Sequence, residues 1–320
     1  MNKMIKQDTW QDVPVYTLEN ESLAVTLCPS IGNNVYRIWD KEAEREVLRV
    51  PDSPDVLRKS PVHYGTPVLI PPNRIRSGYF MVGEREYQFD RNEKNNTGNH
   101  IHGLVVGRPW TVIDHGETEG TQYITSVFKT TDHPDVFKQL PHEMIIEMTY
   151  VLQGSRLLQK VTVTNESKAP APFGYGVHTW FRLDGEPGKW TLKLPVDDIW
   201  ELGEDLMPTG RLLPLGDLAG LKEGLPLEGV NLDNVFQNGA NPALAVLAKD
   251  GYEIVYKGSD LYKQWVIYTM GTASEFICLE PYTWVTNAPN VELPSEVTGF
   301  RTIAPGQSLS FDLELDIRRS

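Results

Sequence analysis

Two short segments, about 100 residues apart, each place one titratable side chain among apolar, aromatic and glycine residues. The first is Gly174–Phe181, which contains His178, and the second is Cys278–Trp284, which contains Glu280. A histidine or glutamate is unfavourable in such surroundings unless it has a partner or a chemical task. Because an imidazole titrates near neutral pH and a carboxylate accepts protons, the two side chains predict general acid–base chemistry across a cleft.

Four other segments carry polar side chains beside residues that constrain the backbone. They are Pro71–Phe80 with Asn73 and Arg74, Asn99–Trp110 with His100 and His102, Asn231–Phe236 with Asp233, and Asn287–Asn290. The double proline gives Arg74 a stiff base, and its planar guanidinium can bind hydroxyl groups. We predict that Asp233 lies in a turn. The i, i+2 spacing of His100 and His102 predicts both rings on one face of a strand, as in some metal sites.

Each of these residues also has a purely structural interpretation. Taken alone, His178 fits a hydrogen-bonded core histidine, Arg74 a bridge between loops, and Asp233 an Asx turn. The metal interpretation of His100 and His102 is weakened because no carboxylate or further histidine follows at ligand spacing. The remaining histidines are expected on the surface or in loops: His63, His115, His133 and His142.

Strands are the elements that must hold these residues, because apolar residues recur mostly with period two. The clearest runs are Leu23–Leu27, Tyr123–Phe128, Met144–Leu152, Leu157–Val163, Trp265–Thr269 and Leu309–Leu315. Gln153–Ser155 is typical of a turn between two of them, which predicts an antiparallel hairpin. Recurrent glycine and proline from residue 183 to about residue 241 predict long loops and short strands. We therefore predict an all-β antiparallel sandwich, with residues 1–320 as a single domain.

Composition narrows the partners and the location. The chain has 30 Lys and Arg against 43 Asp and Glu, a formal net charge of −13, so it repels phosphate backbones and anionic lipid. The first ten residues lack the apolar stretch of a signal peptide, and no segment has the roughly 18 apolar residues of a membrane span. Cys28 and Cys278 lie in apolar runs, as buried, reduced thiols do. We expect a cytoplasmic protein without nucleic acid or membrane partners.

Taken in order, the motifs resemble those of the aldose 1-epimerase (galactose mutarotase) family. That family shows Asn-Arg-Ile…Gly…Phe, then His-Gly…Gly…Trp, Gly…His…Phe, Asp…Phe and Glu-Pro…Asn-Ala…Asn. The resemblance spans roughly residues 20 to 317 and includes a closing turn at Ala304–Gln307. The chain departs from the pattern at Gly103-Leu104, where galactose mutarotases tend to have a double glycine, and at Arg108 before Pro109-Trp110. These departures leave the preferred sugar open.

The resemblance implies a large antiparallel β-sandwich that holds a sugar in an open cleft on one sheet. It implies Glu280 as the catalytic base and His178 as the catalytic acid. The substrate-binding residues that it implies are Arg74, His102, Asp233 and Asn73. In the implied reaction the base takes the proton of the C1 hydroxyl while the acid protonates the ring oxygen, so no metal, nucleotide or redox cofactor is needed. We expect apolar surroundings to raise the pKa of Glu280 and nearby carboxylates to raise that of His178.

Three functions remain open at this point. The first is epimerisation at C1 of a free aldohexose such as glucose or galactose. The second is the same reaction on a hexose 6-phosphate bound by Arg108 with Arg74 and Arg76, although Gly107 and the longer spacing before Arg108 argue against it. The third is a non-catalytic carbohydrate-binding domain, which would lack the titratable pair. We expect a monomer or homodimer, and stacking on the sugar by residues among Trp39, Tyr79, Trp180 and Trp284.

Overall fold

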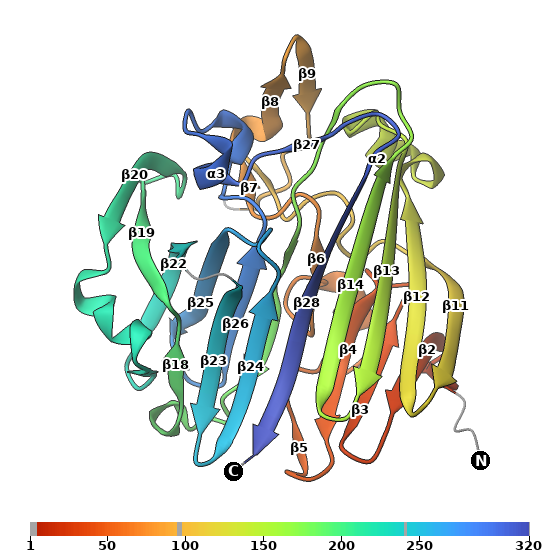
Figure 1. Cartoon of the computed structure of the whole chain (residues 1–320), viewed down its shortest axis with the longest axis vertical. Helices are drawn as coiled ribbons and strands as arrows, with labels where there is room; N and C mark the ends of the chain where they lie inside the picture. Colours follow the sequence, from red (N-terminus) through yellow and green to blue (C-terminus); the bar gives the residue numbers. More distant parts are fainter. Residues whose placement is uncertain (1–4, 95–97, 240–241, 320) are drawn as a thin grey trace.

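Antiparallel strands make up most of the chain, as its period-two pattern predicts. The computed structural model describes residues 5–94, 98–239 and 242–319. In this part the strands form a nine-stranded, an eight-stranded and a five-stranded sheet, together with three two-stranded ribbons. Figure 1 shows the nine-stranded sheet across the front of the molecule with the other two large sheets behind it. The predicted all-β sandwich is therefore confirmed.

The front sheet has the strand order β11-β12-β13-β14-β28-β24-β23-β18-β21. Its strands are β11 (Thr111–Thr118), β12 (Thr121–Lys129), β13 (Met144–Gln153), β14 (Arg156–Asn165), β18 (Thr191–Lys193), β21 (Leu225–Pro226), β23 (Ala243–Lys249), β24 (Tyr252–Gly258) and β28 (Ser308–Arg319). Buried and more exposed side chains alternate along β13 and β14, because one face of the sheet packs on the core. The predicted hairpin turn joins these two strands at Gly154 and Ser155.

The eight-stranded sheet has the order β20-β19-β22-β25-β26-β16-β6, and β17 also pairs with β26. Its strands are β6 (Val68–Leu69), β16 (Gly176–Val177), β17 (Thr179–Arg182), β19 (Val196–Leu202), β20 (Pro208–Pro214), β22 (Asn231–Asn238), β25 (Gln264–Thr272) and β26 (Phe276–Tyr282). The segment rich in glycine and proline contains β18 to β22. Strands β18 and β21 are short, as predicted, whereas β19, β20 and β22 run for seven or eight residues. Glu280 and His178 both belong to this sheet or to its connections.

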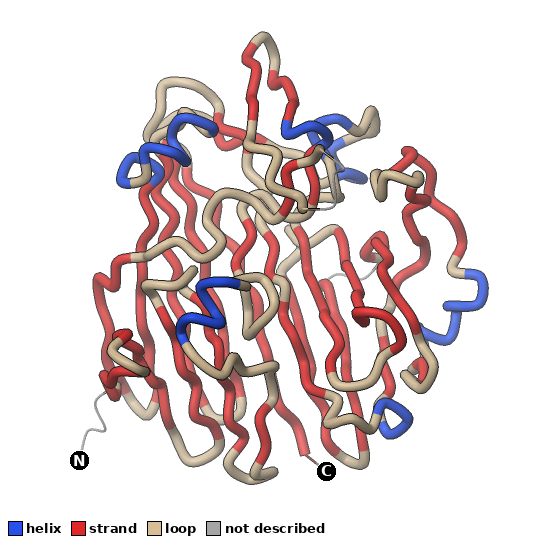
Figure 2. The backbone as a smooth tube through the Cα atoms, turned by 180° about the vertical axis from the view of Figure 1, so that it is seen from behind, coloured by secondary structure: helices blue, strands red, loops and turns tan. Residues whose placement is uncertain are grey.

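Smaller sheets and short helices complete the sandwich. The five-stranded sheet contains β1 (Lys6–Trp10), β2 (Val13–Glu19), β3 (Leu23–Cys28), β4 (Asn34–Asp40) and β5 (Arg45–Glu46). The ribbons pair β7 (Arg74–Ile75) with β10 (His100–Ile101), β8 (Tyr79–Val82) with β9 (Arg85–Gln88), and β15 (Ala171–Pro172) with β27 (Thr302–Ile303). The helices are α1 (Pro54–Lys59), α2 (Pro134–Gln139) and α3 (Ser295–Thr298), and the 3-10 turns are η1 (Arg76–Gly78), η2 (Thr130–Asp132), η3 (Pro187–Lys189), η4 (Gly216–Lys222) and η5 (Ala288–Asn290). Figure 2 shows that loops and a few short helices cross the strands on the rear side.

A large apolar core lies between the sheets and draws residues from nearly the whole chain. Five tryptophans are fully buried in the structure: Trp180, Trp190, Trp200, Trp265 and Trp284. Both cysteines are buried and free, as predicted. His142, expected on the surface or in a loop, lies in the loop between α2 and β13 but is fully buried. Its Nε2 lies 2.7 Å from the hydroxyl of Tyr87, and this hydrogen bond offsets the desolvation of the ring.

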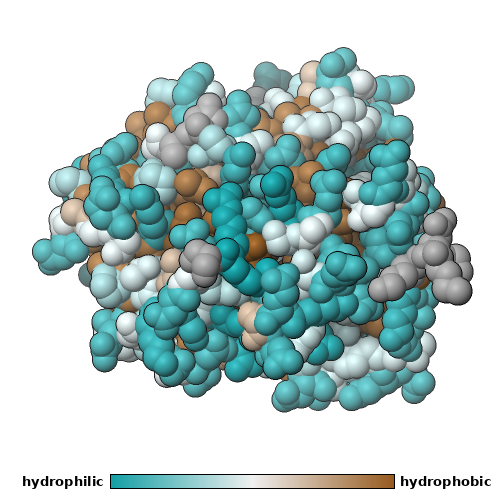
Figure 3. All heavy atoms as spheres, turned by 60° about the horizontal axis from the view of Figure 1, so that its bottom comes forward, coloured by the Kyte–Doolittle hydropathy of each residue, from teal (hydrophilic) through white to brown (hydrophobic). Residues whose placement is uncertain are grey.

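The outer surface is largely hydrophilic, in keeping with the acidic composition. Figure 3 views the molecule from the lower side of Figure 1 and shows hydrophilic residues over most of this face, with hydrophobic residues scattered between them. Among the described residues, no helix has both the length and the apolar character needed to cross a membrane.

Candidate active site

Glu280 lies near the end of β26, in the interior of the eight-stranded sheet. It pairs with Val266 of β25, and 2% of its side chain is exposed. Because side chains alternate along a strand, Cys278, Glu280 and Tyr282 point to the same face of the sheet. The hydroxyl of Tyr282 donates a hydrogen bond to Oε2 of Glu280, which leaves Oε1 for another partner.

His178 lies between β16 and β17, next to the strand that carries Glu280. Strand β17 pairs with β26, with Thr179 opposite Leu279. The backbone N–H of His178 donates to the carbonyl oxygen of Pro67 at 2.9 Å. Its ring stacks on Trp180, with ring centroids 5.3 Å apart. Backbone pairing and stacking together hold the imidazole against β26.

Close packing explains the two glycines that precede His178. A Cβ atom on Gly174 would lie 2.3 Å from the ring of Trp284, and one on Gly176 would lie 2.3 Å from the ring of Tyr282. Protein Cβ atoms do not approach neighbours so closely, and both positions therefore require glycine. The glycines let the His178 segment pack directly on the aromatic residues of the Glu280 segment.

His178 and Glu280 are in direct contact. Nε2 of His178 lies 3.3 Å from Oε1 of Glu280, and the two side chains are 7% and 2% exposed. Nδ1 of His178 is buried without a hydrogen-bond partner in the described part of the chain. Nδ1 of His142 is likewise buried without a partner among the described residues, so this feature alone does not separate the two histidines. The direct contact of a buried imidazole with a buried carboxyl group is what favours a chemical role for the pair over core packing.

Burial determines how the pair is protonated. Loss of solvation raises the pKa of Glu280 well above its usual value, while the Tyr282 hydrogen bond and the charge of Arg74 oppose the rise. The same loss of solvation lowers the pKa of His178 to about 3, and the charge of His63 adds to this effect. Below the raised pKa of Glu280, the pair thus holds one proton.

The predicted pKa shift is confirmed for Glu280 and wrong for His178. We expected nearby carboxylates to raise the pKa of His178, whereas burial lowers it. The physical reason is that burial removes the solvation of the charged imidazolium, and this outweighs the attraction expected from nearby carboxyl groups.

Arg74 approaches the pair from the β7–β10 ribbon. Its Nε donates to Oε1 of Glu93 at 2.7 Å, and the two side chains are 16% and 5% exposed. Its positive charge lowers the pKa of Glu280 and opposes the rise in that of Asp233. The Oδ1 atom of Asn73 accepts the backbone N–H of Arg74 at 2.8 Å. Asn73 thus fixes the backbone at Arg74, while Glu93 is a partner that no sequence motif indicated.

His102 lies on another side of the pair. It follows β10 in the left-handed region, with φ of 64°, and its N–H donates to the carbonyl oxygen of Asn73 at 3.0 Å. Its ring is 5.4 Å from the ring of His178 in an edge-to-face arrangement. Burial and the charge of His178 lower the pKa of His102 well below its usual value, which keeps this ring neutral.

His100 does not share the surroundings of His102. Its Nδ1 lies 2.8 Å from the carbonyl oxygen of Asp90, and its ring packs edge-to-face on Phe89 at 5.0 Å. The prediction of two rings on one face of a strand is wrong, because β10 ends at Ile101 and the left-handed backbone at His102 breaks the alternation. This weakens the metal interpretation of the pair further.

Asp233 lies on strand β22, not in the predicted turn. It pairs with Tyr268 of β25, next to a register shift that follows Asn231. Asp233 is exposed overall, but partial desolvation of its carboxyl group raises its pKa. The positive charge of Arg74 opposes this rise. The charge of Asp233 in turn raises the pKa of Glu280, so both carboxyl groups belong to one electrostatic cluster.

The aromatic residues proposed for stacking differ in how accessible they are. Trp180 and Trp284 are each 1% exposed, and their indole N–H groups donate to backbone carbonyl oxygens. Tyr79 is 38% exposed and lines a cavity of about 690 Å³ between η1, β20 and η5. Tyr268, half-buried and 6.0 Å from Trp180 in an edge-to-face contact, also borders the cluster. No motif singled out Tyr268, because its pairing with Asp233 depends on the register between β22 and β25.

A sequence model of the family described as aldose 1-epimerase matches residues 14–316. The chain belongs to the aldose 1-epimerase family. The motifs that resembled this family thus lie within a match that covers nearly the whole chain. The fold brings their functional candidates into one cluster: His178, Glu280, Arg74, His102 and Asp233. Membership in this family supports the conclusion that the chain is an epimerase that acts on a sugar.

Relatives in the family agree with this assignment. Galactose mutarotase from Mus musculus is 27% identical over 214 residues, which are 63% of this chain and 58% of the mouse protein. The alignment therefore spans less than two thirds of that relative. A galactose mutarotase-like protein from Clostridium acetobutylicum is 27% identical, with a TM-score of 0.93 and all of both chains covered. Galactose 1-epimerase from Lactobacillus acidophilus NCFM, 17% identical, has a TM-score of 0.77 over 100% of this chain and 99% of its own, and shows the shared fold.

Proposed function

We propose that this epimerase is a mutarotase that interconverts the α and β anomers of free aldohexoses such as glucose or galactose. In this proposal Glu280 is the base and His178 is the acid. The observation that carries it is the contact of 3.3 Å between Nε2 of His178 and Oε1 of Glu280 in a nearly buried pair. Membership in the aldose 1-epimerase family gives the reaction class.

The reaction conserves protons and electrons over one turnover. Glu280 takes the proton of the C1 hydroxyl, the C1–O5 bond breaks, and His178 gives its proton to the ring oxygen, leaving an open-chain aldehyde. Rotation about the C1–C2 bond presents the other carbonyl face. The C5 hydroxyl then attacks C1 while His178 recovers its proton and Glu280 returns the other to the new C1 hydroxyl, so both groups end as they began.

The single proton of the pair fits this cycle. In the empty site the raised pKa of Glu280 and the lowered pKa of His178 favour a protonated carboxyl beside a neutral imidazole. Transfer of that proton across the contact gives the carboxylate and imidazolium that ring opening uses. The hydroxyl of Tyr282 and the charge of Arg74 both stabilise the carboxylate form. The pair therefore needs no proton from solvent to reach its working state.

Arg74, His102, Asp233 and Asn73 are proposed to bind the sugar hydroxyls. A guanidinium donates, a carboxylate accepts, and a neutral imidazole does either, so the set can satisfy several hydroxyl groups at once. Nδ1 of His102 is buried without a hydrogen-bond partner in the described part of the chain. A sugar hydroxyl would supply that missing partner.

Pairing of the arginines favours an unphosphorylated substrate. The three arginines considered for a phosphate site each have a carboxylate partner: Arg74 with Glu93, Arg76 with Asp205, and Arg108 with Asp135. A phosphate would have to compete with these ion pairs for guanidinium groups. Arg108 also donates from Nε to the carbonyl oxygen of Leu104 at 2.6 Å, which fixes its side chain outside the cluster.

Polarimetry tests the acid–base assignment. Glu280→Gln and His178→Asn are each expected to lower the catalysed mutarotation of fresh α-glucose and α-galactose by about 100-fold or more, after subtraction of the spontaneous rate. His142→Asn is the matched control, because His142 is also fully buried but bonds Tyr87 outside the cluster. The control is expected to keep its activity. Near wild-type rates in both site variants would contradict the mechanism.

The same assay with glucose 6-phosphate tests the choice of substrate. A free aldohexose is expected to be turned over faster than its 6-phosphate, and Arg108→Gln is expected to leave both rates unchanged. A strong preference for the phosphate that Arg108→Gln abolishes would replace the proposed substrate. Turnover of neither sugar would favour a carbohydrate-binding role.

A further inference from the structure

A thiol that can serve as a metal ligand lies beside the acid–base pair and takes no part in the proposed reaction. Cys278 and Glu280 are two residues apart on β26, so their side chains share one face of the strand. Cys278 is fully buried and free of any disulfide. A ring nitrogen of His178, Sγ of Cys278 and a carboxylate oxygen of Glu280 all lie within 4.8 Å of one another.

This donor set matches the coordination chemistry of Zn²⁺. Zinc binds thiolate, imidazole and carboxylate at about 2.0–2.3 Å, and tetrahedral geometry then holds the donors roughly 3.3–3.8 Å apart. The His178–Glu280 contact of 3.3 Å already falls at this spacing. A small rotation of the Cys278 side chain would shorten the distances from Sγ to the other two donors, which are at most 4.8 Å. No other group of three His, Cys, Asp or Glu residues in the described ranges converges in this way.

We infer that His178, Cys278 and Glu280 form a binding site for a thiophilic divalent cation, Zn²⁺ above all, and that the bound ion inhibits the enzyme. On binding, Sγ of Cys278 forms a metal bond and releases its proton to solvent, as does Glu280 if it is protonated, while the neutral imidazole donates a lone pair. No group is oxidised or reduced. Three protein donors leave the fourth position to water.

Inhibition follows because the metal uses the same atoms as the proposed proton transfers. An imidazole nitrogen bound to zinc has no free lone pair and carries no proton to give to the ring oxygen, and a carboxylate bound to zinc is a much weaker base towards the sugar hydroxyl. This part of the inference rests on the proposed function. The surrounding charges permit a cation, because Arg74 is paired with Glu93 and Asp233 adds a negative charge near Glu280.

Cobalt spectroscopy tests binding without relying on activity. Co²⁺ added to the wild-type protein is expected to give the visible bands of a tetrahedral site together with a thiolate-to-cobalt charge-transfer band. Cys278→Ser should lose the charge-transfer band, whereas Cys28→Ser should keep it, since Cys28 is the other buried free thiol. Absence of the band in the wild-type protein would overturn the site, whatever the variants do.

Inhibition by ZnCl₂ in a buffer that does not chelate metals tests the consequence. Mutarotation by the wild-type protein is expected to fall as Zn²⁺ is added and to recover fully with EDTA. Cys278→Ser should need about tenfold more Zn²⁺ or more for the same inhibition, with its activity in EDTA unchanged, while Cys28→Ser should match the wild type. Equal sensitivity of the wild type and Cys278→Ser to Zn²⁺ would overturn the inference.

The two experiments separate this inference from the proposed function. If Glu280→Gln and His178→Asn keep their activity, the acid–base mechanism fails, but the cobalt spectrum still reports the metal site. If both variants are inactive and the wild-type protein shows no thiolate–cobalt band, the metal site alone fails. Should Cys278→Ser not fold, Cys278→Ala and the wild-type spectrum answer the same question.

Discussion

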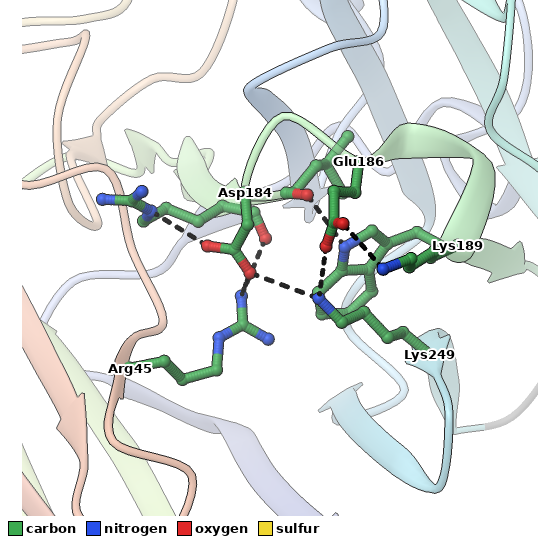
Figure 4. Close-up of polar contacts among 8 residues, drawn as sticks. Arg45, Asp184, Glu186, Lys189 and Lys249 are labelled. Atoms are coloured by element: carbon green, nitrogen blue, oxygen red, sulfur yellow. Dashed lines mark hydrogen bonds and ion pairs between the residues drawn. The ribbon is translucent and has the colours of Figure 1, made fainter.

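Two clusters of charged side chains in this protein differ in how their charges are paired. The first joins Asp184 and Glu186 to four cations, Arg45, Arg182, Lys189 and Lys249 (Figure 4). Asp184 contacts Arg45 at 2.9 Å and Lys249 at 3.6 Å. Glu186 contacts Lys189 at 2.6 Å and Lys249 at 3.5 Å. Each carboxylate thus has at least two hydrogen-bonding or ionic partners of opposite charge within this network.

The second cluster surrounds Glu280 and has the opposite character. Within the part of the chain that the structure describes, the ion-pair partner of Glu280 is His178 alone, and burial lowers the pKa of that histidine to about 3. Arg74 is near enough to act on the pKa of Glu280, but its Nε donates to Glu93. The central carboxyl group therefore lies in a buried position without a fixed positive partner.

The difference shows how position decides what a carboxyl group can do. The hydrogen bond and charge of Lys189 lower the pKa of Glu186, so this group stays ionised and holds surface segments together. Desolvation raises the pKa of Glu280 well above its usual value, as suits a group that must take up and release a proton during a reaction. The first arrangement favours structure and the second favours proton transfer.

The largest effect is expected at Glu280, where a substitution should change activity and stability in opposite directions. Glu280→Gln should lower activity by about 10²–10⁴-fold while raising the melting temperature at neutral pH by roughly 2 °C or more, because it removes a carboxyl group whose ionisation opposes folding. The folded pKa is raised above its ordinary value of 4.5, so the stability gain should grow as pH rises above 4.5 and vanish below it. Differential scanning calorimetry across this range measures it, and a gain that persists below the ordinary pKa would contradict the cause.

Breaking the Arg74–Glu93 pair should be the next largest effect. Arg74→Gln removes the Arg74 charge from Glu93, which is 5% exposed, and should lower the free energy of unfolding by roughly 3 kcal/mol. The double variant Arg74→Gln/Glu93→Gln should regain most of this loss but stay poorly active, because the charge near Glu280 is still absent. Denaturant unfolding and polarimetry measure the two properties, and a double variant with full activity would make Arg74 purely structural.

The strands were predictable because their period-two pattern is local. Alternation along β13 and β14 and the turn at Gly154 need no information from distant residues. Period two also implied that Cys278 and Tyr282 share the face of Glu280, although no motif singled them out. That the distant motifs share one site was implied only by their resemblance to the aldose 1-epimerase family.

Features that depend on contacts between distant residues could not be predicted. Glu93 pairs with Arg74 from a loop without a motif, and the left-handed backbone at His102 turns its ring away from the strand pattern of His100. Asp233 occupies a strand beside a register shift where a turn was expected. The wrong pKa direction for His178 has the same origin, because burial depends on how the whole sheet packs.

The pH dependence of kcat/KM tests the lowered pKa of His178 and with it the difference between the two clusters. Its folded pKa is lowered to about 3 from an ordinary value of 6.5, so a second proton joins the pair only far below neutrality. We expect kcat/KM to stay flat as pH falls from 7 to 5, and to fall at high pH once Glu280 has lost the proton of the pair. Polarimetry corrected for the spontaneous rate at each pH measures the profile. An acid limb with an apparent pKa near 6.5 would mean that His178 titrates as an exposed histidine does.

The smallest effect is expected in the paired cluster. Asp184→Asn removes contacts to Arg45 and Lys249 from a side chain that is 28% exposed, and partly exposed ion pairs contribute about 0.5–1 kcal/mol. Stability should therefore fall slightly, and more at low salt than at high salt, since screening already weakens the pair. Mutarotation should not change, because the network shares no residue with the Glu280 cluster. A loss of activity in Asp184→Asn without a loss of stability would show that the two clusters are coupled, and the division between structural and chemical carboxyl groups would then fail.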